Sequence, residues 1–189
     1  MIDQLVHYDK EFFLFLNNLG TARWDGFWLF MTNKWSSIPL YILLAFLTYR
    51  AFGLKRLLIS LVAIALLILA TDQLANFFKY GVQRLRPCHD PSLNGLMRLV
   101  KGSCGGKFGY FSAHAANSFA VAFFFVSLFR TKYKSFRVVL LVWALVVAYS
   151  RIYIGVHFPM DVLTGILIGT FLGGVFFHLF LKFVAKFAR

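Results

Sequence analysis

The sequence is poor in charge, and above all in negative charge. Only 14% of its 189 residues are charged, and 7 acidic residues face 20 Lys and Arg. Soluble domains carry about 25% charged residues, whereas 60% of this chain is hydrophobic. A chain of this length cannot hide so much apolar surface in a soluble core. The composition therefore predicts an all-α integral membrane protein with a single domain, 1–189.

Potential metal ligands are as scarce as negative charge. The chain has two cysteines, Cys88 and Cys104, and their spacing does not resemble a zinc site. The predicted outer loop also has too few carboxylates to build a magnesium site. We therefore expect no bound metal.

The net charge of +13 does not indicate a nucleic-acid partner. The basic residues cluster between apolar runs and form no continuous stripe, which nucleic-acid binding would require. They suit loops that face anionic membrane lipids.

Five apolar runs predict a bundle of five transmembrane helices. Four clear runs cover residues 57–78, 112–129, 138–154 and 162–183. A fifth, 38–49, is short by itself but can extend back toward Trp35, and each run then approaches the roughly 20 residues that span a bilayer. The segment 1–33 is more amphipathic. We expect residues 9–19 to form an interfacial helix and residues 24–32 a second short one. A sixth span in this segment is the alternative.

Basic residues predict the orientation of the bundle. They form three clusters: Arg50, Lys55 and Arg56; Arg130, Lys132, Lys134 and Arg137; and Lys182, Lys186 and Arg189. With five spans all three clusters fall on one side, which the positive-inside rule makes cytoplasmic. The C-terminus is then cytoplasmic, and the loop 79–111 lies on the outer face.

Three polar motifs interrupt the apolar sequence where spans begin or end. They read Lys79-x6-Arg86-Pro87, Phe111-Ser112-Ala113-His114 and Ser150-Arg151-x5-His157-x3-Asp161. Ionisable residues at a membrane edge are costly and are therefore functional-site candidates. The five-span arrangement brings all three motifs to the outer face. Three cations, two imidazoles and a carboxylate are the groups needed to transfer a phosphate.

Each motif has residue types suited to one part of this chemistry. Ser112 can cap a helix whose free N–H groups bind anions, and His114 can donate a proton to a leaving oxygen. Asp161, four residues after His157, can accept its Nδ1–H and leave Nε2 as a nucleophile. Taken singly, each motif also has an ordinary structural explanation: snorkelling cations, a helix cap, or a carboxylate at a helix start.

Two further features leave alternatives open. Cys88 and Cys104 lie in the outer loop, where an oxidising compartment allows a disulfide; two free thiols are the alternative. Asp72 and Lys79 share one helix face. Asp72 either supports the site or makes an interhelical hydrogen bond.

The three motifs resemble the signature of the type 2 phosphatidic acid phosphatase superfamily. Its pattern is Lys-x6-Arg-Pro, Pro-Ser-Gly-His and Ser-Arg-x5-His-x3-Asp. The first and third match without gaps, whereas Phe111 and Ala113 replace Pro and Gly in the second. The resemblance covers residues 72–161.

The resemblance implies a role for each residue. His157 is the nucleophile that forms a phosphohistidine, Asp161 orients it, and His114 protonates the leaving oxygen and then activates water. The phosphoryl oxygens are held by Lys79, Arg86, Ser112 and Arg151, with the N–H groups of Ala113 and His114. No cofactor is expected, because the cations neutralise the developing charge.

The sequence thus predicts a metal-independent lipid phosphatase, multi-pass in a bacterial inner membrane, with its active site facing the periplasm. Undecaprenyl pyrophosphate is the leading substrate, because the chain is small and has no headgroup-binding domain. Lipid A and phosphatidylglycerophosphate are the alternatives. A non-enzymatic anion or phospholipid transporter is less favoured, since no inverted repeat is visible. The oligomeric state is left open.

Overall fold

The computed structural model describes residues 2–187, and helices account for most of that range. They are α1 (Ile2–Asn18), α2 (Ala22–Thr32), α3 (Ile38–Val82), α4 (Ala113–Leu128), α5 (Lys134–Tyr153) and α6 (Pro159–Phe187), with short 3-10 turns η1 (Lys34–Ser37), η2 (Pro87–His89) and η3 (Pro91–Leu93). Extended pairing within the described residues is limited to one bridge between Leu85 and Phe108. The predicted all-α membrane fold is confirmed.

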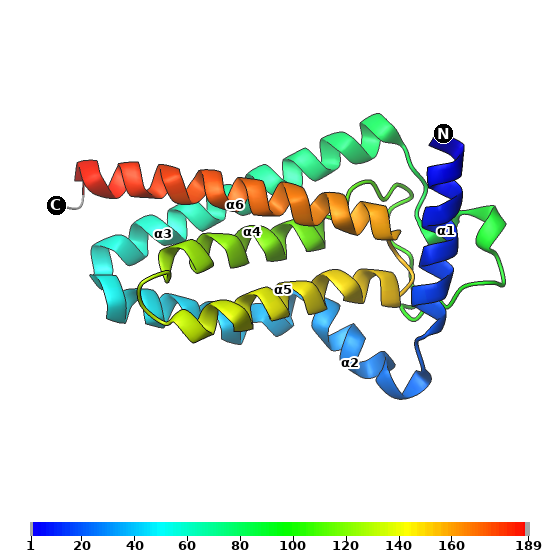
Figure 1. The fold of residues 1–189 in the computed structure, drawn as a ribbon, viewed down its shortest axis with the longest axis horizontal. Coiled ribbons are helices and arrows are strands. Elements are labelled where there is room, and N and C mark those ends of the chain that lie inside the picture. Colours follow the sequence, from blue (N-terminus) through cyan, green and yellow to red (C-terminus); the bar gives the residue numbers. More distant parts are fainter. Residues whose placement is uncertain (1, 188–189) are drawn as a thin grey trace.

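Helix α3 contains two of the predicted spans. It bends at Gly53, whose φ of 82° lies in a region that glycine adopts at no steric cost. The chain reverses direction there, at the cyan end of the bundle (Figure 1). Together α3, α5 and α6 are long and apolar enough to cross a membrane, and α4 is a shorter apolar helix. Because the bend divides α3 into two apolar arms, residues 2–187 contain five helical segments that match the five predicted spans.

Helix α4 forms the centre of the bundle, where it packs against α3, α5 and α6. Glycines on α6 allow the closest of these contacts. A Cβ added to Gly165 would lie 2.6 Å from the carbonyl oxygen of Ser112, and one on Gly173 would lie 2.6 Å from that of Ala120. The small-residue face of α6 therefore holds the first turn of α4 against the first turns of α6.

Helices α1 and α2 cover one end of the bundle, and α1 lies across the helix axes rather than along them (Figure 1). The apolar side chains Phe12, Phe15 and Leu19 are more than half exposed, as expected for a helix at a lipid interface. Helix α1 starts at Ile2 rather than at residue 9. The face turned to the protein is not purely apolar, because it buries Asp9 and Asn17 beside Phe13.

The two ends of the bundle differ in composition. The bend at Gly53, the turn between α4 and α5, and the C-terminal part of α6 share one end (Figure 1). All three basic clusters lie there, and the Nζ of Lys132 donates to the carbonyl oxygen of Ala51 at 3.0 Å; Arg189 is outside the described residues. The other end holds α1, the loop 83–112 and the connection between α5 and α6.

Candidate active site

The three polar motifs come together at the end of the bundle that α1 covers. Lys79 lies in the last turn of α3, and Arg86 follows in the loop. Ser112 caps α4, Arg151 lies in the last turn of α5, and Asp161 lies in the first turn of α6. Residues far apart in sequence therefore meet because four helices begin or end at the same level.

A cavity of about 450 Å³ lies between these helix ends. Its lining includes most of the predicted site residues: Asp72, Lys79, Arg86, Ala113, His114, Arg151 and His157. Ser112 and Asp161 are fully buried and do not line the cavity. The cavity is in the size range of small-molecule sites, and it continues past the cations to Lys34, Ser37 and Tyr41.

The first turn of α4 is fixed from two sides. The hydroxyl of Ser112 accepts a hydrogen bond from the backbone N–H of Ala115 at 3.5 Å, so Ser112 acts as an N-cap. Its own N–H donates to the carbonyl oxygen of Asp161 at 3.0 Å. The second motif is thereby held against the third, which places His114 and His157 on the same cavity.

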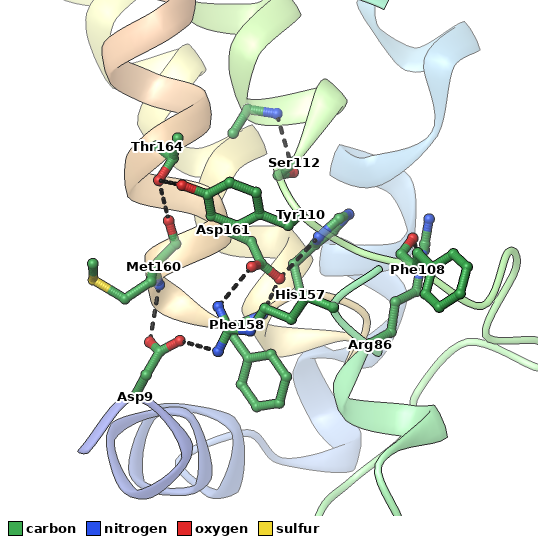
Figure 2. A network of polar contacts seen from close by, with 12 residues as sticks. Asp9, Arg86, Phe108, Tyr110, Ser112, His157, Phe158, Met160, Asp161 and Thr164 are labelled. Atoms are coloured by element: carbon green, nitrogen blue, oxygen red, sulfur yellow. Dashed lines mark hydrogen bonds and ion pairs between the residues drawn. The ribbon is translucent and has the colours of Figure 1, made fainter. Parts of the chain in front are cut away.

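His157 and Asp161 are adjacent and deeply buried (Figure 2). The Nδ1 of His157 is 3.5 Å from Oδ2 of Asp161, which is longer than a good hydrogen bond, and it has no other partner among the described residues. Oδ2 also accepts the N–H of Phe158 at 3.1 Å. Because Asp161 lies on the Nδ1 side, the Nε2 side of the ring is available to the cavity.

Three cations of the predicted site, all lining the cavity, have no counter-ion. Lys79, Arg86 and Arg151 make no ion pair with any residue from 2 to 187. The side chain of Arg151 donates to the hydroxyl of Thr32, and its buried Nε lacks any partner. Unpaired cations are costly to hold in a low-dielectric environment. Such a group can bind an anion.

The loop 83–112 holds Arg86 in place through backbone oxygens. The Nε of Arg86 donates to Phe108 at 3.2 Å and Nη1 donates to Cys104 at 3.1 Å. Cys104 is joined to Cys88 by a disulfide, which closes the loop around this arginine. Gly109 also lies against it: an added Cβ would be 3.0 Å from Cγ of Arg86.

Burial controls the protonation of this site. It lowers the pKa of His157 well below its usual range, and the positive charges of Arg151, Arg86 and Lys79 lower it further. His157 is therefore neutral at pH 7, as a nucleophile must be. Burial also lowers the pKa of Arg86, an effect that Asp161 opposes.

Asp72 makes an interhelical contact at the edge of the cavity. Its Oδ1 accepts a hydrogen bond from Nδ2 of Asn117 on α4 at 2.8 Å. Both residues line the cavity. The interhelical hydrogen bond expected as one alternative for Asp72 is therefore present, and it lies at the cavity wall.

The structure also places residues at this site that the sequence interpretation missed. Arg84 pairs with Asp161 at 2.8 Å and with Asp9 at 2.5 Å. Thr32 and Lys34 bring the end of α2 and the start of η1 to the cavity wall. Arg84 lies within the first motif, between Lys79 and Arg86. Asp9 carries a weak signal, since Phe13 and Asn17 follow it on the same helix face.

Comparisons of sequence agree with the signature read from these motifs. The family profile of the PAP2 superfamily matches residues 56–185. The chain is 38% identical to a lipid A 4'-phosphatase of Bacteroides thetaiotaomicron, over 98% of this chain and 83% of that protein. It is 33% identical to the lipid A 4'-phosphatase of Porphyromonas gingivalis, over 95% and 76%. An undecaprenyl-diphosphatase of Sulfolobus acidocaldarius is 27% identical, over 90% and 77%.

Solved structures show the same fold. The crystal structure of Aquifex aeolicus LpxE superimposes with a TM-score of 0.64 at 28% identity, covering 88% of this chain and 92% of that one. A transmembrane PAP2-type phosphatidylglycerolphosphate phosphatase from Bacillus subtilis gives a TM-score of 0.69 at 22% identity, covering 98% and 89%.

Proposed function

The chain belongs to the PAP2 superfamily, and from this premise we propose that it removes a phosphate from a lipid A-type glycolipid through a phosphohistidine on His157. The family and the phosphatases among the relatives establish the coarser statement, that this is a multi-pass membrane phosphatase acting on lipid phosphate. The substrate, the residue roles and the orientation are our proposal. The observation that carries it is the cavity in which three unpaired cations surround two histidines.

The proposed reaction has two steps at His157. In the first, Nε2 attacks phosphorus, the N–P bond forms, and the P–O bond to the lipid breaks. His114 gives its proton to the leaving oxygen. In the second, His114 takes a proton from water, whose oxygen attacks phosphorus and releases His157 and inorganic phosphate. Asp161 holds the ring by its Nδ1 side and stabilises the positive charge that develops there.

The cations supply the electrostatic part of catalysis. Lys79, Arg86 and Arg151 face the cavity and are positioned before substrate arrives, so little reorganisation is needed as charge moves onto the phosphoryl oxygens. The backbone N–H groups of Ala113 and His114, at the start of α4, add the positive end of a helix dipole. Ser112 fixes this turn from behind. We propose that these groups replace a metal ion.

The relatives favour lipid A over undecaprenyl pyrophosphate, which the sequence alone ranks first. Both relatives described above that exceed 30% identity are lipid A 4'-phosphatases. The cavity supports the same order, because it extends beyond the phosphate-binding cations to Asn33, Lys34, Ser37 and Tyr41. These polar groups suit the sugar that carries the phosphate of a glycolipid better than they suit an isoprenoid chain.

The orientation follows from the distribution of basic residues. The three basic clusters share the end of the bundle opposite the cavity. The positive-inside rule makes that end cytoplasmic, so we propose that the active site opens to the periplasm of a bacterial inner membrane. A disulfide between Cys88 and Cys104 is compatible with that compartment.

Phosphate release from a lipid panel tests the function. Protein purified in detergent is given lipid A, undecaprenyl pyrophosphate or phosphatidylglycerophosphate in the presence of EDTA. We expect lipid A to lose one phosphate, seen by mass spectrometry. We also expect its kcat/KM to be at least 10-fold higher than that of the other lipids, because a substrate that lacks one specific contact is discriminated by about this factor. Preference for another lipid would overturn the substrate, and activity that needs added metal would overturn the mechanism.

Histidine variants test the residue roles. We expect His157→Ala and His114→Ala each to lower kcat by about 10³-fold or more. His178→Ala is the matched control, because His178 is exposed on α6 and, within residues 2–187, hydrogen-bonds only to the carbonyl oxygen of Gly174. Full turnover by His157→Ala would contradict the phosphohistidine. Flux of anions across liposomes that survives loss of both histidines would instead support transport.

A further inference from the structure

Besides its contact with His157, the Asp161 carboxylate accepts hydrogen bonds from two other groups. Its Oδ1 accepts from Nη1 of Arg84 at 2.8 Å, and Oδ2 accepts from the N–H of Phe158 at 3.1 Å. Only Oδ2 lies near Nδ1 of His157, as Figure 2 shows. Because Arg84 occupies the other oxygen, the carboxylate presents one defined oxygen to the imidazole.

Arg84 pairs with the catalytic candidates only at Asp161 among the described residues. It does not line the proposed phosphate-binding cavity, unlike Arg86 two residues later. Its guanidinium lies over the ring of Phe158, 4.3 Å from the ring centre, and its carbonyl oxygen accepts the N–H of Gly109 at 2.8 Å. Backbone and side chain are therefore both fixed, which is what positioning a carboxylate requires.

The second partner of Arg84 comes from α1. Nη2 of Arg84 donates to Oδ2 of Asp9 at 2.5 Å, and Oδ1 of Asp9 accepts the N–H of Met160 at 2.9 Å. Asp9 is only 5% exposed. Close by, Phe13 packs edge-on against Phe158, with 5.4 Å between ring centres. One side chain of the interfacial helix thus contacts both Arg84 and the first turn of α6.

We propose that Asp9 and Arg84 are positioning residues, which together fix the Asp161 carboxylate so that His157 keeps its nucleophilic tautomer. Charge alternates along the chain of contacts, from Asp9 to Arg84 to Asp161. Each buried charge has an opposite neighbour, so removing one member leaves another uncompensated. The inference rests on the proposed function in one respect, that His157 is the nucleophile.

An ordinary structural ion pair would show the same contacts, so the test must separate the two roles. The charged and titratable groups that face His157 and Asp161 come from four helices and the loop: Asp9, Lys79, Arg84, Arg86, His114 and Arg151. Of these, only Asp9 and Arg84 are outside the cavity. Their variants leave every phosphate-binding group in place, which predicts an effect on kcat rather than on KM.

Steady-state kinetics is the first test. We expect Arg84→Gln and Asp9→Asn to lower kcat by about 10-fold to 100-fold, the cost of a small misplacement of reacting groups, with KM changed less than twofold. Lys10→Gln is the matched control. Lys10 is next to Asp9 in the sequence, and this change breaks its own ion pair with Asp90, 2.7 Å apart, which does not involve Asp161. Equal kcat in all three variants would overturn the inference. Arg84→Lys keeps the charge if Arg84→Gln does not fold, and we expect it to remain at least 10-fold impaired because an ammonium cannot bridge two carboxylates in the same geometry.

The acid limb of the kcat/KM profile is the second readout. Loss of the negative charge in Asp9→Asn makes protonated His157 less favourable, which moves its pKa and the limb to lower pH. Loss of the positive charge in Arg84→Gln moves both to higher pH. Each shift is about half a pH unit for a charge several ångströms away. A merely structural loosening admits water and moves both variants upward, and that outcome would overturn the inference.

A readout without turnover separates this inference from the proposed function. The ¹⁵N NMR shifts of the His157 ring, assigned with His157→Gln, report which nitrogen carries the proton. We expect the Nδ1–H tautomer in the wild type and in Lys10→Gln, and a mixture in Asp9→Asn and Arg84→Gln. The same tautomer in all four proteins refutes positioning even if the enzyme is active. If the wild type releases no phosphate from any lipid, the function fails, whereas the tautomer result still decides the positioning.

Discussion

Arg151 shows how a single residue in this site is prepared for an anion. It is 5% exposed, has no ion-pair partner within the described chain, and leaves its Nε without a hydrogen bond. A buried guanidinium in this state is unfavourable until phosphate oxygens complete its bonds. The neutral hydroxyl of Thr32 holds it without neutralising it, so its charge stays available to an anion in the cavity.

The Thr32 hydroxyl therefore has a measurable role. We expect Thr32→Val to lower kcat/KM about 10-fold to 100-fold, the cost of one lost hydrogen bond to a charged group, because Arg151 loses its orienting partner. Thr32→Ser keeps a hydroxyl at the same position and should retain most of the activity. Phosphate release over a range of substrate concentrations checks this. Equal impairment in the two variants would mean that the methyl group of Thr32, rather than its hydroxyl, is what matters.

At the scale of elements, the contact between α4 and α6 determines the site. The first turn of α4 carries His114, and the first turn of α6 carries Asp161. Gly165 allows the two helices to approach until the carbonyl oxygen of Ser112 would be 2.6 Å from a Cβ at that position. A stripe of small residues thus brings two motifs to one cavity, in the same way that such stripes pack other membrane helices.

A methyl group at Gly165 should separate the two helices. We expect Gly165→Ala to destabilise the protein by about 1–3 kcal/mol, as overpacking does, and to lower activity because the first turn of α4 shifts away from His157. Gly174→Ala is the control on the same helix, since a Cβ there meets nothing within 4 Å; helix propensity makes it neutral or slightly stabilising. Thermal unfolding in detergent and phosphate release measure both effects. A Gly165→Ala protein as stable and active as Gly174→Ala would contradict this reading of the contact.

On the scale of the whole molecule, the candidate active site and the basic residues that predict membrane orientation lie at opposite ends of the bundle. The cavity, the disulfide and α1 occupy one end, and the basic clusters occupy the other. Between them, exposed apolar side chains such as Phe46, Leu61 and Leu167 suit contact with lipid tails. A lipid phosphate can then reach the cations at the membrane edge while its acyl chains stay in the bilayer.

Reporter fusions test this orientation in cells. With five crossings and the basic end inside, green fluorescent protein fused after residue 189 should fluoresce, and alkaline phosphatase fused there should be inactive. Fusion within the loop 83–112 should give the opposite result. Alkaline phosphatase activity from the C-terminal fusion would invert the proposed topology and place the active site in the cytoplasm.

The membrane class, the five crossings and the three polar motifs could be predicted from sequence for one physical reason. Ionisable residues are costly in an apolar chain, so those that remain stand out. Helical spacing then relates neighbours such as His157 and Asp161 without knowledge of packing. The sequence separates the spans 38–49 and 57–78, but no local pattern shows that the chain turns sharply at Gly53.

Only the tertiary structure shows that Asp9, Arg84 and Thr32 belong to the site. Asp9 and Asp161 lie at opposite ends of the sequence, and their link through Arg84 depends on how α1 crosses the ends of α5 and α6. Such contacts follow from helix packing, which local spacing does not determine. The sequence by itself determined which groups are candidates for the chemistry, because their types and spacing are local. The fold decided which groups hold them in position, because burial and long-range contact exist only once the helices have packed.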